Sequence, residues 1–333
     1  MTHHSLASIA SDVRNGQSLS AAQIHTLITL DDERLPELLA HAHDIRMARF
    51  GNRVSLCAIV NAQSGHCSED CSFCAQSAHH DTHCPEHALL SPEEIGEAAR
   101  LAKEHGAQRF GVVASGKFVG HDLLEGFVRS VRAVAQQGLM PDLSPGILGR
   151  DQLLALKKAG LCGYHHNLET SASYFSKVCT THTYEEDVQA VRTAMEAGLD
   201  VCCGGIFGIG ESWDDRVELA LQLRDLGIRS VPLNFLTPIP GTPLAGQAIL
   251  SPEEALHIVA LYRFLLPESA LRICGGRQTV FGLDRKRELL KSGANGIMVG
   301  DYLTTSGPSV ESDHVEITRA GLTFGKQQSE VLS

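Results

Sequence analysis

Short apolar runs alternate with amphipathic segments along the chain from about residue 50 onward. The apolar runs have the length of buried strands, and the segments between them have the 3.6-residue period of helices. The eight predicted strands are 54–60, 109–115, 140–144, 161–169, 199–207, 230–236, 270–276 and 296–300. Helices long enough to connect parallel strands separate most of them, so the pattern predicts a parallel sheet.

Helix ends are marked by residues whose side chains suit them. Ser91 followed by Glu94 is the pattern of a capping box, and the same Ser-Pro-Glu-Glu start recurs at Ser251. Two further segments have acidic first turns and end at Gly198 and Gly227. Acidic residues stabilise helix N-termini and glycine stops helices, so these signals support helices between the predicted strands.

Eight strand–helix units predict an α/β fold of the (β/α)8 TIM-barrel type. We expect the barrel over residues 51–315, a helical extension over residues 1–50, and a C-terminal tail over residues 316–333. Active sites of such barrels lie at the carboxyl ends of the strands. The loop after the first predicted strand should therefore lie at the catalytic face.

Composition narrows the possible partners and the compartment. The 333 residues are 43% hydrophobic and 20% charged, with a formal net charge of −11. With no basic run, neither nucleic acid nor an anionic membrane surface is an expected partner. The N-terminus has no signal-peptide pattern and no apolar run is long enough to span a membrane, so we expect a cytoplasmic protein. In that compartment the ten cysteines should be buried thiols or metal ligands.

Three of these cysteines, Cys67, Cys71 and Cys74, lie in the stretch SGHCSEDCSFCAQSAHH. A zinc site would need a fourth ligand, for which the nearby candidates are His66, His79 and His80. A redox C-x2-C pair would leave Cys67 without a role. A [4Fe–4S] cluster held by three cysteines would keep one iron free to bind the amine and carboxylate of a small molecule.

The spacing C-x3-C-x2-C, with the aromatic Phe73 before the third cysteine, favours the cluster. It resembles the signature of radical S-adenosylmethionine enzymes. Further segments resemble the biotin synthase family, in the order found in that family: YHHNLETS, CCGGIFGIGES, VPLNFLTPIPGTPL and LRICGGR. Together with the cysteine loop they cover roughly residues 45–310.

The resemblance implies a cytosolic homodimer with a (β/α)8 barrel, which inserts sulfur into dethiobiotin to form biotin. It implies a [4Fe–4S] cluster, S-adenosylmethionine, a second iron–sulfur cluster that supplies sulfur, and a reducing partner of the flavodoxin or ferredoxin type. A saturated C–H bond has no acidity that side chains can exploit, so a radical derived from a cofactor is needed.

The resemblance also implies roles for single residues. Asn167, Glu169 and Asn234 would line the pocket for substrate and ribose hydroxyls, with glutamate in place of an aspartate common in the family. The segment 204–211 would contact the adenosine moiety. Its glycines would allow close approach of the backbone, although a tight strand-to-helix turn explains them equally well. They are Gly204, Gly205, Gly208 and Gly210.

The sequence departs from the family at the second cluster, which in the family is a [2Fe–2S] cluster held by three cysteines and an arginine. Arg272 and Cys202 match two of them, but the other two positions are occupied by Gly111 and Asp142. Glycine has no side chain to donate, and aspartate is a poor ligand for an iron–sulfur centre. We expect a substitute cluster, with four irons, beside Arg272. Its expected ligands are Cys57, Cys179, Cys202 and Cys274, whereas Cys84, Cys162 and Cys203 are assigned to packing or surface.

Two other functions stay open at this point. The loss of two usual ligands is compatible with a relative that kept the radical chemistry without sulfur insertion, such as a mutase or a C–C lyase. A zinc-binding or regulatory protein on a barrel scaffold is the alternative outside these enzymes.

Overall fold

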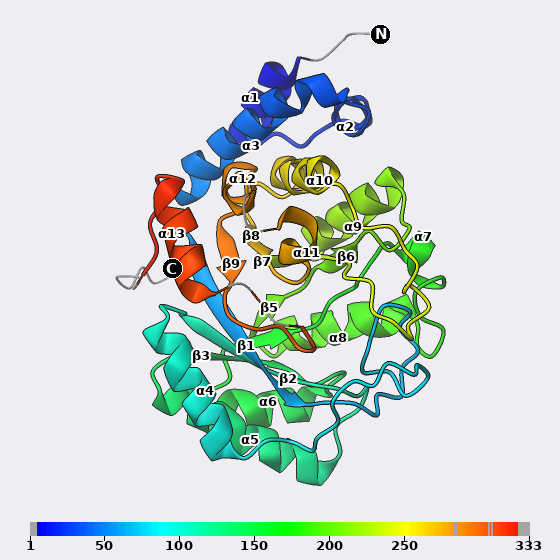
Figure 1. Ribbon diagram of the computed structural model, residues 1–333, viewed down its shortest axis with the longest axis vertical. Coiled ribbons are helices and arrows are strands. Elements are labelled where there is room, and N and C mark those ends of the chain that lie inside the picture. Colours follow the sequence, from blue (N-terminus) through cyan, green and yellow to red (C-terminus); the bar gives the residue numbers. More distant parts are fainter. Residues whose placement is uncertain (1–4, 283–284, 306, 308, 326–333) are drawn as a thin grey trace.

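The computed structural model describes residues 5–282, 285–305, 307 and 309–325 (Figure 1). Within them, nine parallel strands form one sheet in the order β5-β4-β3-β2-β1-β9-β8-β7-β6, and β5 also pairs with β7. This last pairing closes the sheet into a barrel, around which the helices lie. The predicted (β/α)8 barrel with an N-terminal helical extension is thus confirmed.

The strands are β1 Ser55–Gln63, β2 Arg109–Ala114, β3 Met140–Ser144, β4 Gly163–His165, β5 Asp200–Cys202, β6 Gly205–Phe207, β7 Ser230–Phe235, β8 Ala270–Ile273 and β9 Gly296–Met298. The helices are α1 Leu6–Arg14, α2 Ala21–Ile28, α3 Leu35–Phe50, α4 Pro92–Glu104, α5 His121–Gln136, α6 Arg150–Ala159, α7 Ala172–Phe175, α8 Tyr184–Glu196, α9 Trp213–Asp225, α10 Pro252–Leu265, α11 Arg277–Phe281, α12 Lys286–Lys291 and α13 Val310–Arg319, with a 3-10 turn η1 at Asp32–Arg34.

Strands β5 and β6 are two parts of one interrupted strand, the fifth of the eight predicted. Cys202 lies opposite Ser230 and Gly205 opposite Leu233, so the register on β7 is the same on both sides of the break. At the break the partner residue is Pro232, which has no N–H for the sheet. The barrel of eight predicted strands therefore contains nine strand segments in the structure.

The predicted helix starts are confirmed. Ser91 accepts a hydrogen bond from the Glu94 amide, and the Glu94 side chain accepts one from the Ser91 amide, which completes the capping box. Ser251 accepts a hydrogen bond from the Glu254 amide at the start of α10. The glycine that follows α8, Gly198, has φ +72°, a backbone conformation that favours glycine.

The fourth predicted strand is shorter than expected. It ends at His165, and the chain continues as a loop in which Glu169 has φ +61°. Asn167 and Glu169, which were predicted to lie on this strand, therefore lie on the loop that follows it.

The two ends of the chain pack on one side of the barrel. Helix α3 packs against α10, and Figure 1 shows α1–α3 stacked beyond α10 and α12. Helix α13 runs through the predicted boundary between residues 315 and 316, and Thr323 forms a parallel bridge with Arg53. The rest of the predicted tail, residues 326–333, lies outside the described residues.

Alternate residues of β1 differ in burial. Leu56 and Ala58 are buried in the layer between strands and helices, whereas Cys57 and Ile59 are only half-buried. Side chains that point into a barrel are normally packed in layers. Half-buried residues at these inward positions border open space inside the barrel.

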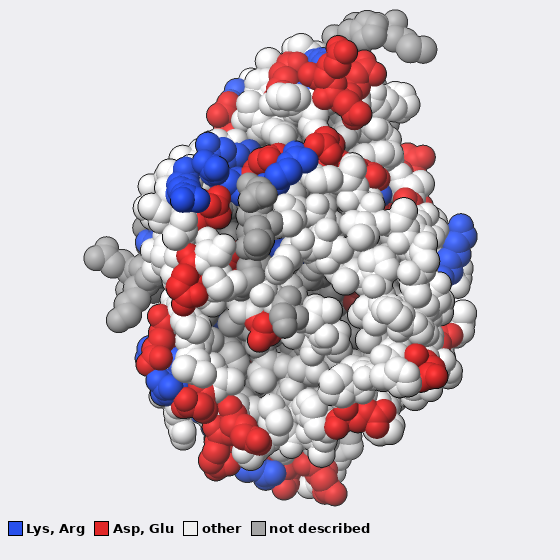
Figure 2. All heavy atoms as spheres, viewed as in Figure 1, with Lys and Arg blue, Asp and Glu red and all other residues white. Residues whose placement is uncertain are grey.

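Acidic side chains form several separate groups around the margin of the face in Figure 2, in keeping with the net charge of −11. Basic side chains gather in one patch over α12, which includes Arg285, Arg287 and Lys291. Within the described residues, no helix combines the length and the apolar character that crossing a membrane requires.

Candidate active site

The loop that follows β1 folds back on itself and gathers three thiols. The Cys67 amide donates to the Gln76 carbonyl (3.0 Å), and the Ala78 amide donates to the Cys67 carbonyl (2.8 Å). A turn between Cys71 and Cys74 (N···O 2.9 Å) brings the other two cysteines to the same end of the loop. The loop thus lies at the carboxyl end of its strand, as predicted.

Electrostatics in this loop fit a positively charged centre. Burial, together with the nearby Cys67, raises the pKa of Cys74 to about 11. The pKa of Cys71 is also raised, first by a hydrogen bond with Cys179, then by burial and by Cys74. Buried thiols that resist ionisation side by side are a donor set that lacks its cation, and clustered thiolates suit iron–sulfur centres.

The histidines predicted as possible zinc ligands have other partners. The imidazole of His79 bonds the Ser68 carbonyl (3.0 Å), and that of His80 bonds the Cys71 carbonyl (3.1 Å). His66 pairs with Glu86 (2.8 Å) at an exposed position. None of these hydrogen bonds involves a cysteine sulfur, so the geometry does not favour a closed zinc site.

Asn167 and Glu169 come together beside the break in the fifth strand. The Asn167 amide donates to Glu169 (3.3 Å), and its carbonyl oxygen accepts from the Gly204 amide (3.1 Å). Asn234 has a similar place on β7, where its side chain donates to the Gly205 carbonyl (3.2 Å). All three residues lie at the carboxyl ends of the strands, and burial raises the pKa of Glu169 to about 8.

The glycines of segment 204–211 are required by the fold itself. A Cβ on Gly205 would lie 2.4 Å from the Glu169 carbonyl oxygen, and Gly208 has φ +88°. Contacts of this kind explain Gly204 and Gly210 as well. The structure therefore supports the tight-turn explanation for these residues, and an adenosine contact remains a proposal.

A second group of thiols lies inside the barrel. Cys57 on β1 and Cys274 after β8 are hydrogen-bonded to each other. Cys202 on β5 is close enough to Cys274 to help raise the pKa of that thiol, and Cys57 in turn helps raise the pKa of Cys202. Ser230 donates a hydrogen bond to the Cys202 sulfur (3.3 Å). The predicted convergence of these three cysteines is what the structure shows.

Arg272 lies beside this thiol group. Its guanidinium donates to the hydroxyls of Ser55 (2.9 Å) and Ser230 (3.0 Å). Among the described residues no carboxylate forms an ion pair with it. Gly296 makes room for this side chain, because a Cβ there would lie 2.8 Å from the Arg272 Cγ. A cation inside a barrel, without a carboxylate and next to three thiols, is suited to an anionic centre.

The two positions that lost the usual ligands offer no replacement. Asp142 is held by Arg109 through a two-pronged ion pair (closest N···O 2.6 Å), and Arg109 also pairs with Asp200 (2.9 Å). A Cβ on Gly111 would lie 3.0 Å from the Ile59 side chain. Asp142 is thus engaged in an ion pair, and that neither position serves a cluster stays a prediction.

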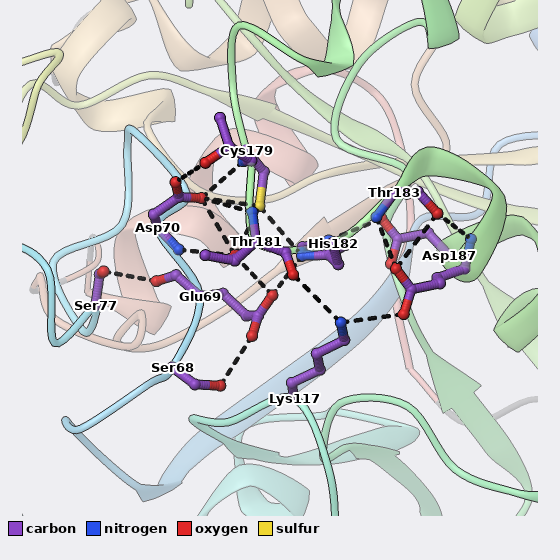
Figure 3. A network of polar contacts seen from close by, with 12 residues as sticks. Ser68, Glu69, Asp70, Ser77, Lys117, Cys179, Thr181, His182, Thr183 and Asp187 are labelled. Carbon is purple, nitrogen blue, oxygen red and sulfur yellow. Dashed lines mark hydrogen bonds and ion pairs between the residues drawn. The ribbon is translucent and has the colours of Figure 1, made fainter.

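Cys179 was expected among the thiols inside the barrel, and this was wrong. The structure places it beside Cys71 of the cysteine loop, and Figure 3 shows it next to Asp70 of the same loop. Its sulfur lies 3.2 Å from Asp70 Oδ1 and 3.1 Å from His182 Nδ1. The segment after α7 turns toward the loop, a path that residue spacing does not reveal.

Sequence reasoning missed two features of the site. Glu69 and His182 form a buried network with Cys179, in which His182 bonds Glu69 (2.6 Å) and Asp187 (3.2 Å) (Figure 3). A cavity of about 240 Å³ opens at the ends of β7, β8 and β9. Its lining residues are Thr237, Gly276, Gln278, Thr279, Tyr302 and Thr305. The residues of the network and those of the cavity come from separate segments of the chain. They form no sequence motif, so only the tertiary structure shows that they lie together.

The raised pKa of Glu169 predicts a pH-dependent stability. Between its ordinary value of 4.5 and about 8, the folded protein keeps a proton that the unfolded chain releases. The free energy of unfolding should therefore fall as pH rises through this range. In Glu169→Gln this part of the fall should disappear. Urea unfolding of both proteins near pH 5 and near pH 8, without S-adenosylmethionine, measures the difference. An equally steep fall in the variant would contradict the assignment.

Comparisons with known proteins agree with this geometry. Residues 63–223 match the model of the Radical SAM superfamily, and residues 232–323 match that of the Biotin and Thiamin Synthesis associated domain. Methylornithine synthase has the same fold, with a TM-score of 0.83 and 22% identity, over 96% of this chain and 97% of that one. The FeFe-hydrogenase maturase HydG from Carboxydothermus hydrogenoformans has a TM-score of 0.80 and 18% identity, over 95% and 78%.

Curated relatives are closer in sequence. The biotin synthase of Pelotomaculum thermopropionicum is 47% identical over 90% of this chain and 94% of its own length. That of Syntrophotalea carbinolica is 45% identical over 96% and 98%, and that of Geobacter sulfurreducens is 44% identical over 95% and 96%. With nearly full-length matches at this identity, the chain belongs to the biotin synthase family.

Proposed function

We propose that this protein is a biotin synthase, which converts dethiobiotin to biotin by S-adenosylmethionine-dependent sulfur insertion. One observation carries the proposal: the barrel holds two separate groups of thiols, one in the loop after β1 and one inside. Sulfur insertion needs both a source of radicals and a source of sulfur, whereas a mutase or C–C lyase needs only the first.

Cys67, Cys71 and Cys74 would hold a [4Fe–4S] cluster that binds S-adenosylmethionine. When bound, this cluster supplies the electron that cleaves the sulfonium. The loop's own backbone hydrogen bonds hold the three cysteines together, and all three are half-buried. Asn167, Glu169 and Asn234 would orient substrate and ribose hydroxyls at the ends of neighbouring strands. Segment 204–211, with Gly204, Gly205, Gly208 and Gly210, would form the adenosine side of the site.

Cys57, Cys202 and Cys274 would hold the auxiliary cluster that supplies sulfur. The half-buried thiols Cys57 and Cys202 border open space inside the barrel, where such a group fits. Arg272 would be its neighbouring cation, because its guanidinium is already engaged by two hydroxyls. With Cys179 elsewhere, three thiolates would hold a four-iron centre and leave one iron without a protein ligand.

The remaining features of the proposal follow the family resemblance. We propose a homodimer in the cytoplasm that receives electrons from a flavodoxin- or ferredoxin-type protein. All ten cysteines are free thiols in the structure, which is in keeping with a reducing compartment.

Anaerobic reconstitution tests the function directly. Incubation with dethiobiotin, S-adenosylmethionine and a strong reductant should yield biotin, and iron analysis should find about eight irons per chain. About four irons with cleavage of S-adenosylmethionine but no biotin would favour the mutase or lyase alternative. A colourless protein that contains zinc would overturn both.

A further inference from the structure

Two segments far apart in the sequence run side by side at the cysteine loop. The Ser72 amide donates to the Val178 carbonyl (2.8 Å). Two residues away on each segment, the Asp70 carboxylate accepts from the Thr180 amide (2.8 Å). Residues 70 and 72 thus lie opposite 180 and 178, in antiparallel order. The residue between each pair is a cysteine on both segments, so Cys71 lies opposite Cys179.

The two thiols are in contact. Cys71 and Cys179 are hydrogen-bonded to each other, and Figure 3 shows the Cys179 side chain directed toward the loop that carries Asp70. Cys71 is half-buried, whereas Cys179 is only 3% exposed. Asp70, Thr181 and His182 all lie within 3.3 Å of the Cys179 sulfur and keep it in this position.

The other two cysteines of the loop are placed differently. Cys67 and Cys74 affect one another's environment through charge, and no hydrogen bond joins their thiols to Cys71 among the described residues. The turn between Cys71 and Cys74 also brings these two residues close together, so a link within this C-x2-C pair is the competing outcome. A disulfide requires Cα atoms within about 7 Å and facing Cβ atoms. The two hydrogen bonds that flank Cys71 and Cys179 place these residues opposite one another, which favours a link between them.

We propose that Cys179 is the resolving thiol of Cys71, so that the cluster-free loop closes a reversible Cys71–Cys179 disulfide under oxidation. Peroxide reaches the half-buried Cys71 sulfur before the nearly fully buried Cys179 sulfur. It oxidises the Cys71 thiol to a sulfenic acid and is itself reduced, with release of one water. The Cys179 sulfur then attacks the Cys71 sulfur and a second water leaves. The two thiols together lose two electrons and two protons, which the peroxide takes up.

The disulfide protects the loop from damage. A sulfenic acid without a resolving partner is oxidised further to sulfinic and sulfonic acids, which are lost as iron ligands. A dithiol reductant restores both thiols from the disulfide. The disulfide itself rests only on the juxtaposition of the two segments, whereas its consequence for cluster uptake rests on the proposed function.

Peptide mapping tests the disulfide. The full-length chain is freed of iron by a chelator under reducing conditions, treated with a small excess of hydrogen peroxide, alkylated and digested with trypsin. Cys71 lies in tryptic peptide 54–100, and Cys179 is the one cysteine of peptide 178–192. We expect these two peptides to be linked. Further cleavage after Glu69 and after Phe73 separates Cys71 from Cys67 and Cys74. An alkylated Cys179, or a link within peptide 54–100, would overturn the proposal.

Cys179→Ser provides the matched variant, because a hydroxyl can keep the contacts with Asp70, Thr181 and His182. Before peroxide treatment, both proteins should take up the cluster to the same extent, as judged by iron–sulfur absorption. After peroxide and then dithiol treatment, wild type should regain this uptake, and the variant should regain at least about twofold less, with Cys71 found as sulfinic or sulfonic acid. Equal recovery would contradict protection. Cys162→Ala should behave as wild type. If no cluster absorption appears even before peroxide, the proposed function fails while the peptide map still decides the disulfide.

Discussion

Replacement of Cys74 by alanine is expected to abolish both cleavage of S-adenosylmethionine and formation of biotin. The three thiols of the loop after β1 are the proposed ligands of one [4Fe–4S] cluster, and with two ligands the cluster is not retained. Alanine is preferred to serine for this test because a hydroxyl can bind iron. Absorption of the reconstituted protein, 5′-deoxyadenosine and biotin are the quantities to measure, and all three should fall to background.

Cys84→Ala is the control for this change. Cys84 lies near this group, but its sulfur contacts Ser64 (3.7 Å) and the Pro85 carbonyl (3.6 Å), and it is not one of the three proposed ligands. It should keep the cluster and both products. A Cys74→Ala protein that retains iron–sulfur absorption and produces 5′-deoxyadenosine would remove Cys74 from the ligand set.

Replacement of Cys274 by alanine is expected to separate the two activities. Its thiol is hydrogen-bonded to Cys57 inside the barrel, apart from the cysteine loop. Loss of one of three proposed ligands should prevent assembly of the auxiliary cluster, so iron content should drop from about eight to about four per chain. Cleavage of S-adenosylmethionine should continue, but biotin should not form. Iron and sulfide analysis combined with assays of both products measures this outcome.

Cys57→Ala should have the same effect, since Cys57 and Cys274 act in the same group. Cys203→Ala is the matched control: Cys203 is fully buried, adjacent to Cys202, and packs in the hydrophobic layer between strands and helices. It should form both products. A normal yield of biotin from both Cys274→Ala and Cys57→Ala would show that a cluster held by these cysteines is not the source of the inserted sulfur.

Local features were predictable because their physical basis lies within a few residues. The capping box at Ser91 and the three-cysteine loop each depend on short spacing, and both are present in the structure. The barrel was predictable because short apolar runs alternate with amphipathic helical segments along the chain. The fourth strand was predicted too long because the chain leaves the sheet after His165, and the sequence of residues 166–169 has no signal for this change of path.

The amino-acid sequence by itself determined the barrel, the family and the cysteines that offer sulfur. The tertiary structure decided how those cysteines are divided. Cys57, Cys202 and Cys274 meet because strand order and register bring β1, β5 and β8 around one interior, whereas the segment after α7 carries Cys179 to Cys71. Which thiols share a site depends on distances through space, and spacing along a chain determines those distances only within a single loop.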